Sequence, residues 1–252
     1  MTPLSGMYKY FTSICAALAV SGGCLTAQTN TVPSLGLGGG EPDKHTHFRF
    51  QGIPTNASIV SVSAHLIVDQ AATNGLNFFA VQVNFPNKTW AHGGPQVNTG
   101  KELANWGGLV NRGGGSKDYT EVNWQEDLKL IECGIDKPNT VPFKWDRNCE
   151  YILNIERGQQ VQLPAGTNAH FHVTAPARSM WEWKFSITPV GPGKETFTSF
   201  LYDSADHIRS FYLWNESGYG STSAEQHTRW SLPVYRVAGS SEDKVPTGWT
   251  RF

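Results

Sequence analysis

Residues 181–188 have the sequence Trp-Glu-Trp-Lys-Phe-Ser-Ile-Thr, in which large apolar side chains alternate with polar ones. Successive side chains of a β-strand point to opposite faces of the sheet, so this segment has one apolar and one polar face. The same alternation recurs in residues 60–69, 79–85 and 151–156, and a further strand begins near Ile208. These segments predict half-buried β-strands whose apolar sides form a common core.

The rest of the composition favours strands over helices. Of the 252 residues, 26 are Gly and 14 are Pro, and clusters of them separate the alternating segments. The best helical pattern, at residues 124–131, is long enough for only two turns. No repeat of fixed period and no change of composition divides residues 44–238. We therefore predict one all-β domain, an antiparallel β-sandwich over residues 44–238. Its core is expected to contain Val62, Leu66, Val81, Trp181, Trp183 and Phe185.

The N-terminal residues predict export from the cell. Lys9 precedes a short apolar run at residues 11–20, and Ala27 provides a small residue for cleavage. We therefore expect residues 1–27 to be a signal peptide. The apolar run is only about half as long as a bilayer-crossing helix, so we expect no membrane span.

The mature protein is thus expected to be secreted, periplasmic or on the cell surface. An alternative is a lipid anchor on Cys24, but Ser21 stands where a bacterial lipobox usually has Leu. Residues 28–43 are rich in Thr, Gly, Pro and Ser and predict a flexible leader, and residues 239–252 predict a polar C-terminal tail.

Removal of the signal peptide leaves two cysteines, Cys133 and Cys149. In an oxidising compartment we expect them to form one disulfide. Two buried thiols are the alternative. No Cys-x-x-Cys pair occurs, so the spacing of a cysteine zinc site is missing.

The charge balance excludes one class of partner. The chain has 20 Lys plus Arg and 21 Asp plus Glu, a net charge of -1. Such a protein has no overall field that attracts nucleic acid or an anionic lipid surface. The nine Trp residues suggest another kind of partner.

Two glycine-rich segments, residues 89–96 and 105–115, combine Trp with amide and Arg side chains. Glycine lets a backbone approach a ligand closely, a Trp face packs on the C–H side of a sugar ring, and amide groups bond hydroxyls. These segments predict a site for an oligosaccharide or polysaccharide. The alternative is that their Trp residues close the ends of the sandwich core. The candidate ligand-binding residues are Trp90, His92, Gln96, Asn105, Trp106 and Arg112, with Trp214, Glu216 and Arg229 from the C-terminal strands.

Catalytic residues are harder to assign. A glycosidase needs two carboxylates about 5–10 Å apart, and Glu182 and Glu216 are the candidates, although both could be ordinary surface carboxylates. The sequence has no Gly-x-Ser-x-Gly elbow, Walker loop, Rossmann fingerprint or HExxH motif. His170 and His172 share one face of a predicted strand and are weak candidates for metal ligands, but the carboxylate of a metal-binding cupin is missing. We expect no metal and no other cofactor, and the sequence leaves open whether the protein is an enzyme.

The order of several short motifs resembles a known group of proteins. These motifs are His92-Gly93-Gly94-Pro95-Gln96, Asn105-Trp106-Gly107-Gly108, Phe143-Lys144-Trp145, Trp181-Glu182-Trp183-Lys184-Phe185, Trp214-Asn215-Glu216 and Arg229-Trp230-Ser231. Together they look like secreted bacterial β-sandwich domains of unknown function, which are similar in outline to concanavalin-type lectin and glycanase jelly rolls. The resemblance implies a jelly-roll, concanavalin-like sandwich, and it carries over no catalytic residues. The chain lacks the Gln-x-His and Tyr-x-Lys patterns of alginate-lyase-like jelly rolls, which counts against a lyase.

Three functions fit an exported, neutral, Trp-rich sandwich. The first is a carbohydrate-binding, lectin-like or cell-surface adhesion module, because aromatic and amide groups are visible in the predicted loops. The alternative is a secreted polysaccharide-degrading enzyme, a glycoside hydrolase or lyase. The third is a structural protein of the cell envelope. Fold resemblance alone cannot choose between them.

Overall fold

The computed structural model describes residues 35–38, 45–73, 75–109, 129–130, 140–163, 166–168, 173–175, 177–218 and 226–251. These residues form two seven-stranded sheets and a small hairpin, and every strand pairing is antiparallel. The described residues contain no helix. The predicted all-β class and antiparallel β-sandwich are therefore confirmed. The jelly-roll order stays a prediction.

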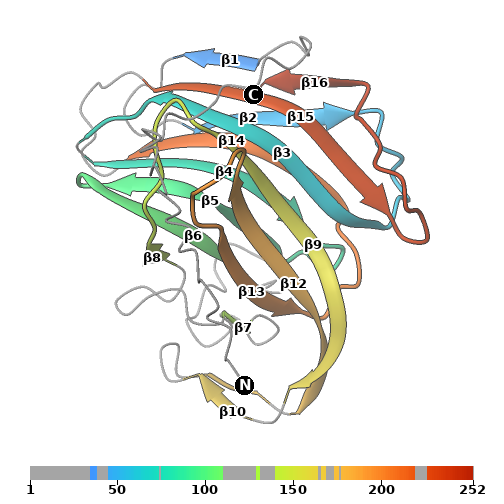
Figure 1. Ribbon diagram of the computed structural model, residues 1–252. Helices are drawn as coiled ribbons and strands as arrows, with labels where there is room; N and C mark the ends of the chain where they lie inside the picture. Colours follow the sequence, from blue (N-terminus) through green and yellow to red (C-terminus); the bar gives the residue numbers. More distant parts are fainter. Residues whose placement is uncertain are drawn as a thin grey trace, which may run out of the picture.

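The first sheet contains the longest strands of the chain (Figure 1). In spatial order its strands are β1 (Leu35–Gly38), β15 (His227–Val237), β3 (Ile59–Gln70), β9 (Glu150–Leu163), β12 (Arg178–Pro189), β13 (Phe197–Asp203) and β7 (Lys129–Leu130). At their far ends β9 and β12 run towards the separate hairpin of β10 (Gly166–Asn168) and β11 (Val173–Ala175).

The second sheet carries the glycine-rich segments that the sequence singled out. In spatial order its strands are β16 (Gly248–Arg251), β2 (His45–Gln51), β14 (Ser210–Gly218), β4 (Leu76–Asn84), β5 (Trp90–Asn98), β6 (Lys101–Leu109) and β8 (Thr140–Pro142). Residues 105–109 belong to β6, so this part of the predicted loop is a strand.

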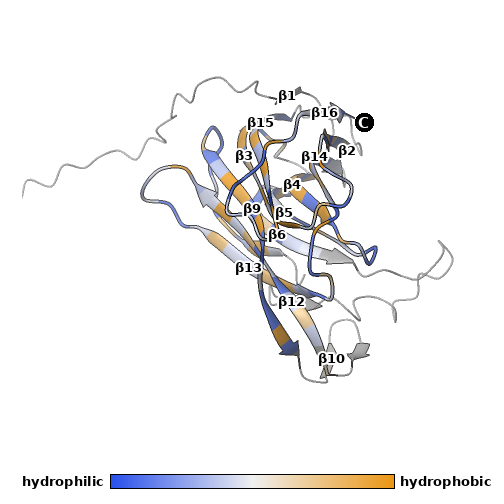
Figure 2. Cartoon of the chain, turned by 90° about the vertical axis from the view of Figure 1, so that its right-hand side faces the viewer, coloured by the Kyte–Doolittle hydropathy of each residue, from blue (hydrophilic) through white to orange (hydrophobic). Residues whose placement is uncertain are grey.

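The core lies between the two sheets, and it follows from the alternation seen in the sequence. Val62, Leu66, Val81, Trp183 and Phe185 are all at most 1% exposed, as predicted. Alternating hydrophobic and hydrophilic bands are visible along the strands (Figure 2). Burial of such apolar surface is the main force that holds two sheets together.

Trp181 departs from this pattern. The pairing of β12 with β9 shifts register between Trp181 and Trp183. The irregularity places one extra residue in β9, between Arg157 and Gln160, and such a bulge bends the strand opposite Trp181. Trp181 is only partly buried at the margin of the core, and the guanidinium carbon of Arg157 lies 4.5 Å from its ring centroid.

Strand pairing extends beyond the predicted limits of 44–238. Residues 35–38 of the predicted leader form β1, which pairs with β15, and residues 248–251 of the predicted tail form β16, which pairs with β2. Edge strands are held by backbone hydrogen bonds, so they need no periodic apolar side chains to mark them in the sequence. Of residues 124–131, which carried the best helical pattern in the sequence, the structure describes only Lys129–Leu130, and these form strand β7.

Several expectations concern the N-terminus and the cysteines. The signal peptide, Cys24 and Cys133 lie outside the described residues, so the export signal, the lipid anchor and the disulfide stay predictions. Cys149 is 4% exposed, and its Sγ atom lies 3.1 Å from Nζ of Lys194. Within the described part of the chain, no helix is long and apolar enough to cross a membrane.

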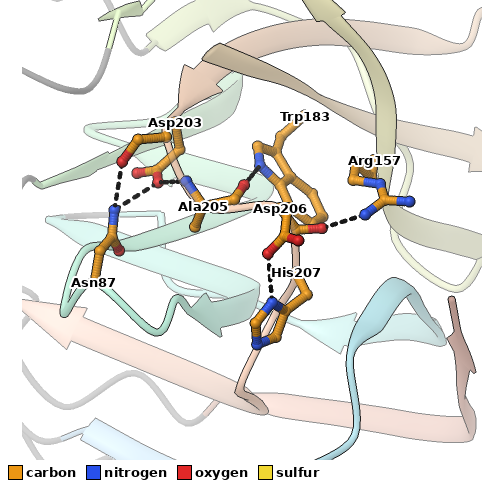
Figure 3. A network of polar contacts seen from close by, with 8 residues as sticks. Asn87, Arg157, Trp183, Asp203, Ala205, Asp206 and His207 are labelled. Atoms are coloured by element: carbon orange, nitrogen blue, oxygen red, sulfur yellow. Dashed lines mark hydrogen bonds and ion pairs between the residues drawn. The ribbon is translucent and has the colours of Figure 1, made fainter. Parts of the chain in front are cut away.

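A network of hydrogen bonds joins the two sheets at one end of the sandwich (Figure 3). The carboxylate of Asp203, at the end of β13, is fully buried. It accepts hydrogen bonds from Asn87 Nδ2 at 2.8 Å, Thr89 Oγ1 at 2.6 Å and the Ala205 amide nitrogen at 2.7 Å. Asn87 and Thr89 belong to the turn between β4 and β5, so this carboxylate ties the second sheet to the first. Next to it, Trp183 Nε1 donates to the carbonyl oxygen of Ala205 at 3.3 Å.

Candidate functional site

The second sheet buries apolar side chains on both of its faces. In β4 every residue from Leu76 to Val81 is buried. Phe79 and Val81 point into the core between the sheets. Phe78 and Ala80 belong to a separate cluster, completed by Leu76 and Trp214, on the opposite face. We call this opposite side the outward face of the second sheet. A sandwich sheet needs only one apolar face, so this second cluster requires another explanation.

Five aromatic rings lie next to one another across the outward face. His47 of β2 stacks on Trp214 of β14, with ring centroids 5.3 Å apart and planes inclined by 6°. Trp214 lies 5.5 Å from His92 of β5, and His92 lies 5.0 Å from Trp90 of the same strand. Phe78 packs edge-on against Trp214 at 5.6 Å and His92 at 5.0 Å. We call these five residues the aromatic row.

The strand order explains why the row is continuous. Trp214 is paired with His47 on one side and with Ala80 on the other. Strands β14 and β5 flank β4, and two strand spacings amount to about 9.6 Å. The rings of Trp214 and His92 can still approach to 5.5 Å, because the intervening Ala80 has only a methyl group.

Gly94 lies beside Ala80 at the centre of this face. A Cβ atom added to Gly94 would lie 1.8 Å from the carbonyl oxygen of Phe79 and 3.0 Å from Cα of Ala80. The backbones of β4 and β5 therefore approach each other more closely here than a side chain would permit. Two small residues, Gly94 and Ala80, thus lie side by side at the centre of the outward face.

Polar groups border this position on the side of β5 and β6. Asn105 is paired with Gly94 and is 8% exposed, and its Nδ2 atom donates to Thr140 Oγ1 at 3.1 Å. Its Oδ1 atom is buried and has no hydrogen-bond partner among the described residues. Nδ1 of His92 is likewise buried and lacks a partner within the described part of the chain. Gln96, opposite Phe78, is 6% exposed.

Burial also determines the charge of His92. Removal of the imidazole from water disfavours its protonated form and lowers the pKa of His92 from 6.5 to about 4. The ring is therefore uncharged near neutral pH. An uncharged imidazole has one nitrogen that donates and one that accepts a hydrogen bond, which suits it to a ligand hydroxyl.

The structure brings together six of the nine predicted ligand-binding residues. These six, on alternating positions of the outward face, are Trp90, His92, Gln96, Asn105, Trp214 and Glu216. Arg112 lies outside the described residues.

Trp106 and Arg229 lie elsewhere. The Trp106 indole is fully buried in the core, where it stacks on Phe185 at 5.1 Å. This agrees with the alternative interpretation, in which the Trp fills the core and does not contact a ligand. Arg229 belongs to β15 of the first sheet. Its guanidinium binds both carboxylate oxygens of Asp69, through Nε at 2.9 Å and Nη2 at 2.7 Å.

The two candidate catalytic carboxylates are not brought together. Glu182 lies on β12 of the first sheet, where a Cβ atom on Gly158 would meet its Oε1 at 2.6 Å. Glu216 lies on β14 of the second sheet, on the outward face. His170 and His172 lie outside the described residues, and the described part of the chain contains no cluster of three or more potential metal ligands.

Sequence reasoning missed two members of the aromatic row. Neither His47 nor Phe78 was among the predicted ligand-binding residues. The adjacent pair Phe78-Phe79 carries a usable signal, because neighbouring residues in a strand point to opposite faces. Two adjacent aromatic residues therefore indicate a strand that is apolar on both sides.

No protein-family model matches the sequence, and no curated protein matches it. The resemblance to secreted bacterial sandwich domains stays a prediction.

Proposed function

We propose that the protein binds an oligosaccharide or polysaccharide on the outward face of its second sheet. The observation that carries this proposal is the aromatic row, which crosses the sheet from β2 to β5 on the side opposite the core. Packing of the domain does not require these rings, because the core on the other face already holds the two sheets together.

The chemistry of the row suits a sugar chain. Aromatic rings combine a large apolar surface with few rotatable bonds, so they bind the C–H face of a pyranose at a low entropic cost. In the row the partly exposed rings are those of His47, Trp90 and His92, whereas Phe78 and Trp214 are buried. From β2 to β5 the row extends over three strand spacings, about 14 Å. That length accommodates several consecutive sugar rings. Amide side chains at its border, from Gln96 and Asn105, bond hydroxyl groups.

Binding is favoured over cleavage. Glu182 and Glu216, the carboxylates that the sequence offered as an acid and base, belong to different sheets. A glycosidase requires both carboxylates next to one glycosidic bond. The expected export signal agrees with a ligand found outside the cell.

Replacement of Trp90 by Ala tests the proposal. Trp90 is half-buried at one end of the row, 5.0 Å from His92. We expect Trp90→Ala to weaken saccharide binding about tenfold or more, because truncation of an aromatic anchor usually costs more than 1 kcal/mol. The probes are hexasaccharides of cellulose, xylan, mannan and polygalacturonate, and the measurement is isothermal titration calorimetry.

Trp249→Ala is the matched control. This Trp is 46% exposed, and its ring contacts Phe48 of the core instead of the row. We expect this variant to bind as the wild type does. Equal affinities of Trp90→Ala and wild type, or the absence of wild-type binding to every probe, would contradict the proposal.

A further inference from the structure

The outward face contains two buried polar atoms whose hydrogen-bonding capacity is unused. Asn105 Oδ1 and His92 Nδ1 have no partner among the described residues. Both residues lie on the same face as the aromatic row, on the neighbouring strands β6 and β5. A buried polar atom without a hydrogen bond is unfavourable, and such atoms are rare in folded proteins. Two of them beside one ring cluster indicate groups that a ligand satisfies.

The positions of the two residues in the sheet suit adjacent groups on one ligand. His92 is paired with Gly107, and Asn105 is paired with Gly94, so the two side chains are diagonal neighbours. Diagonal neighbours of an antiparallel pair are about 7 Å apart. Hydrogen bonds of about 2.8 Å from each side therefore converge on two groups that are themselves a few ångströms apart.

The chemistry of the two atoms selects hydroxyl groups. A carbonyl oxygen of an amide only accepts hydrogen bonds, the amide nitrogen only donates, and the two ends of an Asn side chain exchange places by a half-turn. A neutral imidazole nitrogen also donates or accepts according to its tautomer. A hydroxyl group does both, so it fits either orientation at each position, whereas a carboxylate only accepts.

Charge leads to the same class of ligand. His92 is uncharged near neutral pH because burial lowers its pKa to about 4. Arg49 of β2 lies at the other end of the row, where its guanidinium carbon is 5.7 Å from the Tyr212 ring centroid. Three strand spacings, about 14 Å, separate β2 from β5. Arg49 is thus too far from His92 and Asn105 to pair with the negative charge of an acidic sugar bound there.

Resting on the proposed function, we propose that His92 Nδ1 and the Asn105 amide bind two adjacent hydroxyl groups of a neutral sugar ring at the β5 end of the aromatic row. There the half-buried Trp90 ring lies 5.0 Å from the imidazole of His92, whereas Ala80, Phe78 and Trp214 are buried. The ligand is accordingly a neutral glycan with free vicinal hydroxyls.

Two variants test this subsite by calorimetry with the same hexasaccharides. His92→Phe keeps an aromatic ring of similar shape and removes its nitrogens, and Asn105→Ala removes the amide. We expect each to bind the neutral hexasaccharide about 3- to 10-fold more weakly than the wild type, the effect of losing one hydrogen bond. Asn154→Ala is the matched control, since this amide lies on β9 of the first sheet and accepts from Ser61 Oγ. It should bind as the wild type does.

The ligand can be varied in parallel. O-methylation of the sugar hydroxyls should weaken binding to the wild type and have a smaller effect on Asn105→Ala and His92→Phe, because the contact is already lost there. If Asn105→Ala does not fold, His92→Phe supports the same comparison. The inference is overturned if both variants bind as the wild type does, or if the wild type prefers oligogalacturonate. In those two cases, weaker binding by Trp90→Ala would still support the proposed saccharide-binding function. If the wild type binds none of the probes, both the proposed function and the subsite of His92 and Asn105 are overturned.

Discussion

At the level of single residues, His92 connects the stability of the fold to its candidate site. The imidazole has Phe78, Trp90 and Trp214 as ring neighbours and a buried Nδ1 atom. An unfolded chain exposes the same ring to water, where its pKa is 6.5. Folding therefore lowers its affinity for protons, and the stability of the native state depends on pH.

We expect acid to destabilise the native protein through His92. Between pH 6.5 and about 4 the unfolded chain binds a proton that the native state does not, so the free energy of unfolding decreases as the pH falls through this window. The contribution is fully present above pH 6.5, and its loss amounts to up to about 3 kcal/mol. Urea unfolding at pH 7.0, 6.0, 5.0 and 4.5 measures it. The His92→Phe variant should show a flatter profile, and equal slopes would show that another group titrates.

The residues show where sequence reasoning succeeded and why it failed. Trp90, His92 and Trp214 were predicted as ligand-binding residues because Trp and His lie near glycines, and the structure places them together in the aromatic row, while their role in binding stays a prediction. Asn105 and Trp106 were assigned together as neighbours in one loop, yet they lie in β6, where adjacent side chains point to opposite faces. Asn105 consequently lies on the outward face and Trp106 in the core. The chemistry of each residue was visible, but the face it occupies depends on the strand.

At the level of elements, the contact between β4 and β5 supports the candidate site. These strands run beneath the middle of the aromatic row, and Gly94 permits their close approach. The alternation that marks β4 was predictable, and so was the strand at residues 181–188. The strand character of 90–98 and 101–109 was not, because their glycines, proline and amides resemble a loop in composition.

Gly94→Ala should destabilise the fold strongly. The added methyl group would overlap the Phe79 carbonyl oxygen, which belongs to backbone and cannot rotate away. We expect a loss of about 3 kcal/mol or more, at the upper end of single substitutions, measured as a lower urea midpoint. In contrast, a Cβ on Gly248 of β16 would meet the side chain of Gln51, with Oε1 at 3.3 Å and Cβ at 4.0 Å. Gly248→Ala therefore serves as control and should change stability little. Equal midpoints for the two variants would contradict the close contact.

At the level of the whole molecule, the sandwich is closed at its margins by segments that the sequence placed outside the domain. Strand β16 covers the edge of β2, and the Trp249 ring lies 5.7 Å from that of Phe48. Additional contacts come from the Thr247 amide, which donates to the Gln51 carbonyl at 3.0 Å. Two-sheet architecture followed from alternation and turn residues, whereas these edge pairings depend on backbone hydrogen bonds that leave no pattern in the side chains.

Removal of residues 246–252 should destabilise the protein without changing its affinity for the saccharide. The truncation exposes one side of Phe48 and Phe50 and removes the pairing of β16 with β2. We expect a loss of about 1–3 kcal/mol, comparable to partial exposure of a large apolar side chain, measured by urea unfolding. Saccharide affinity should persist, because β16 lies at the edge of the sheet and contributes no residue to the aromatic row. An unchanged urea midpoint would show that β16 does not contribute to the sandwich.

The two apolar faces of β4 also have a consequence for folding. If β4 shifted by one residue against β5, Phe78 would enter the core and Phe79 would join the aromatic row, an exchange that hydrophobicity hardly distinguishes. Asn77 does distinguish the two alignments. It is fully buried, exchanges two hydrogen bonds of 3.3 Å with the backbone of Ala72 and accepts another from Gln226 Nε2. A shift by one residue would turn this amide to the outward face, away from the Ala72 backbone, and its hydrogen bonds would be lost. One polar side chain therefore favours the native alignment of the strand beneath the site.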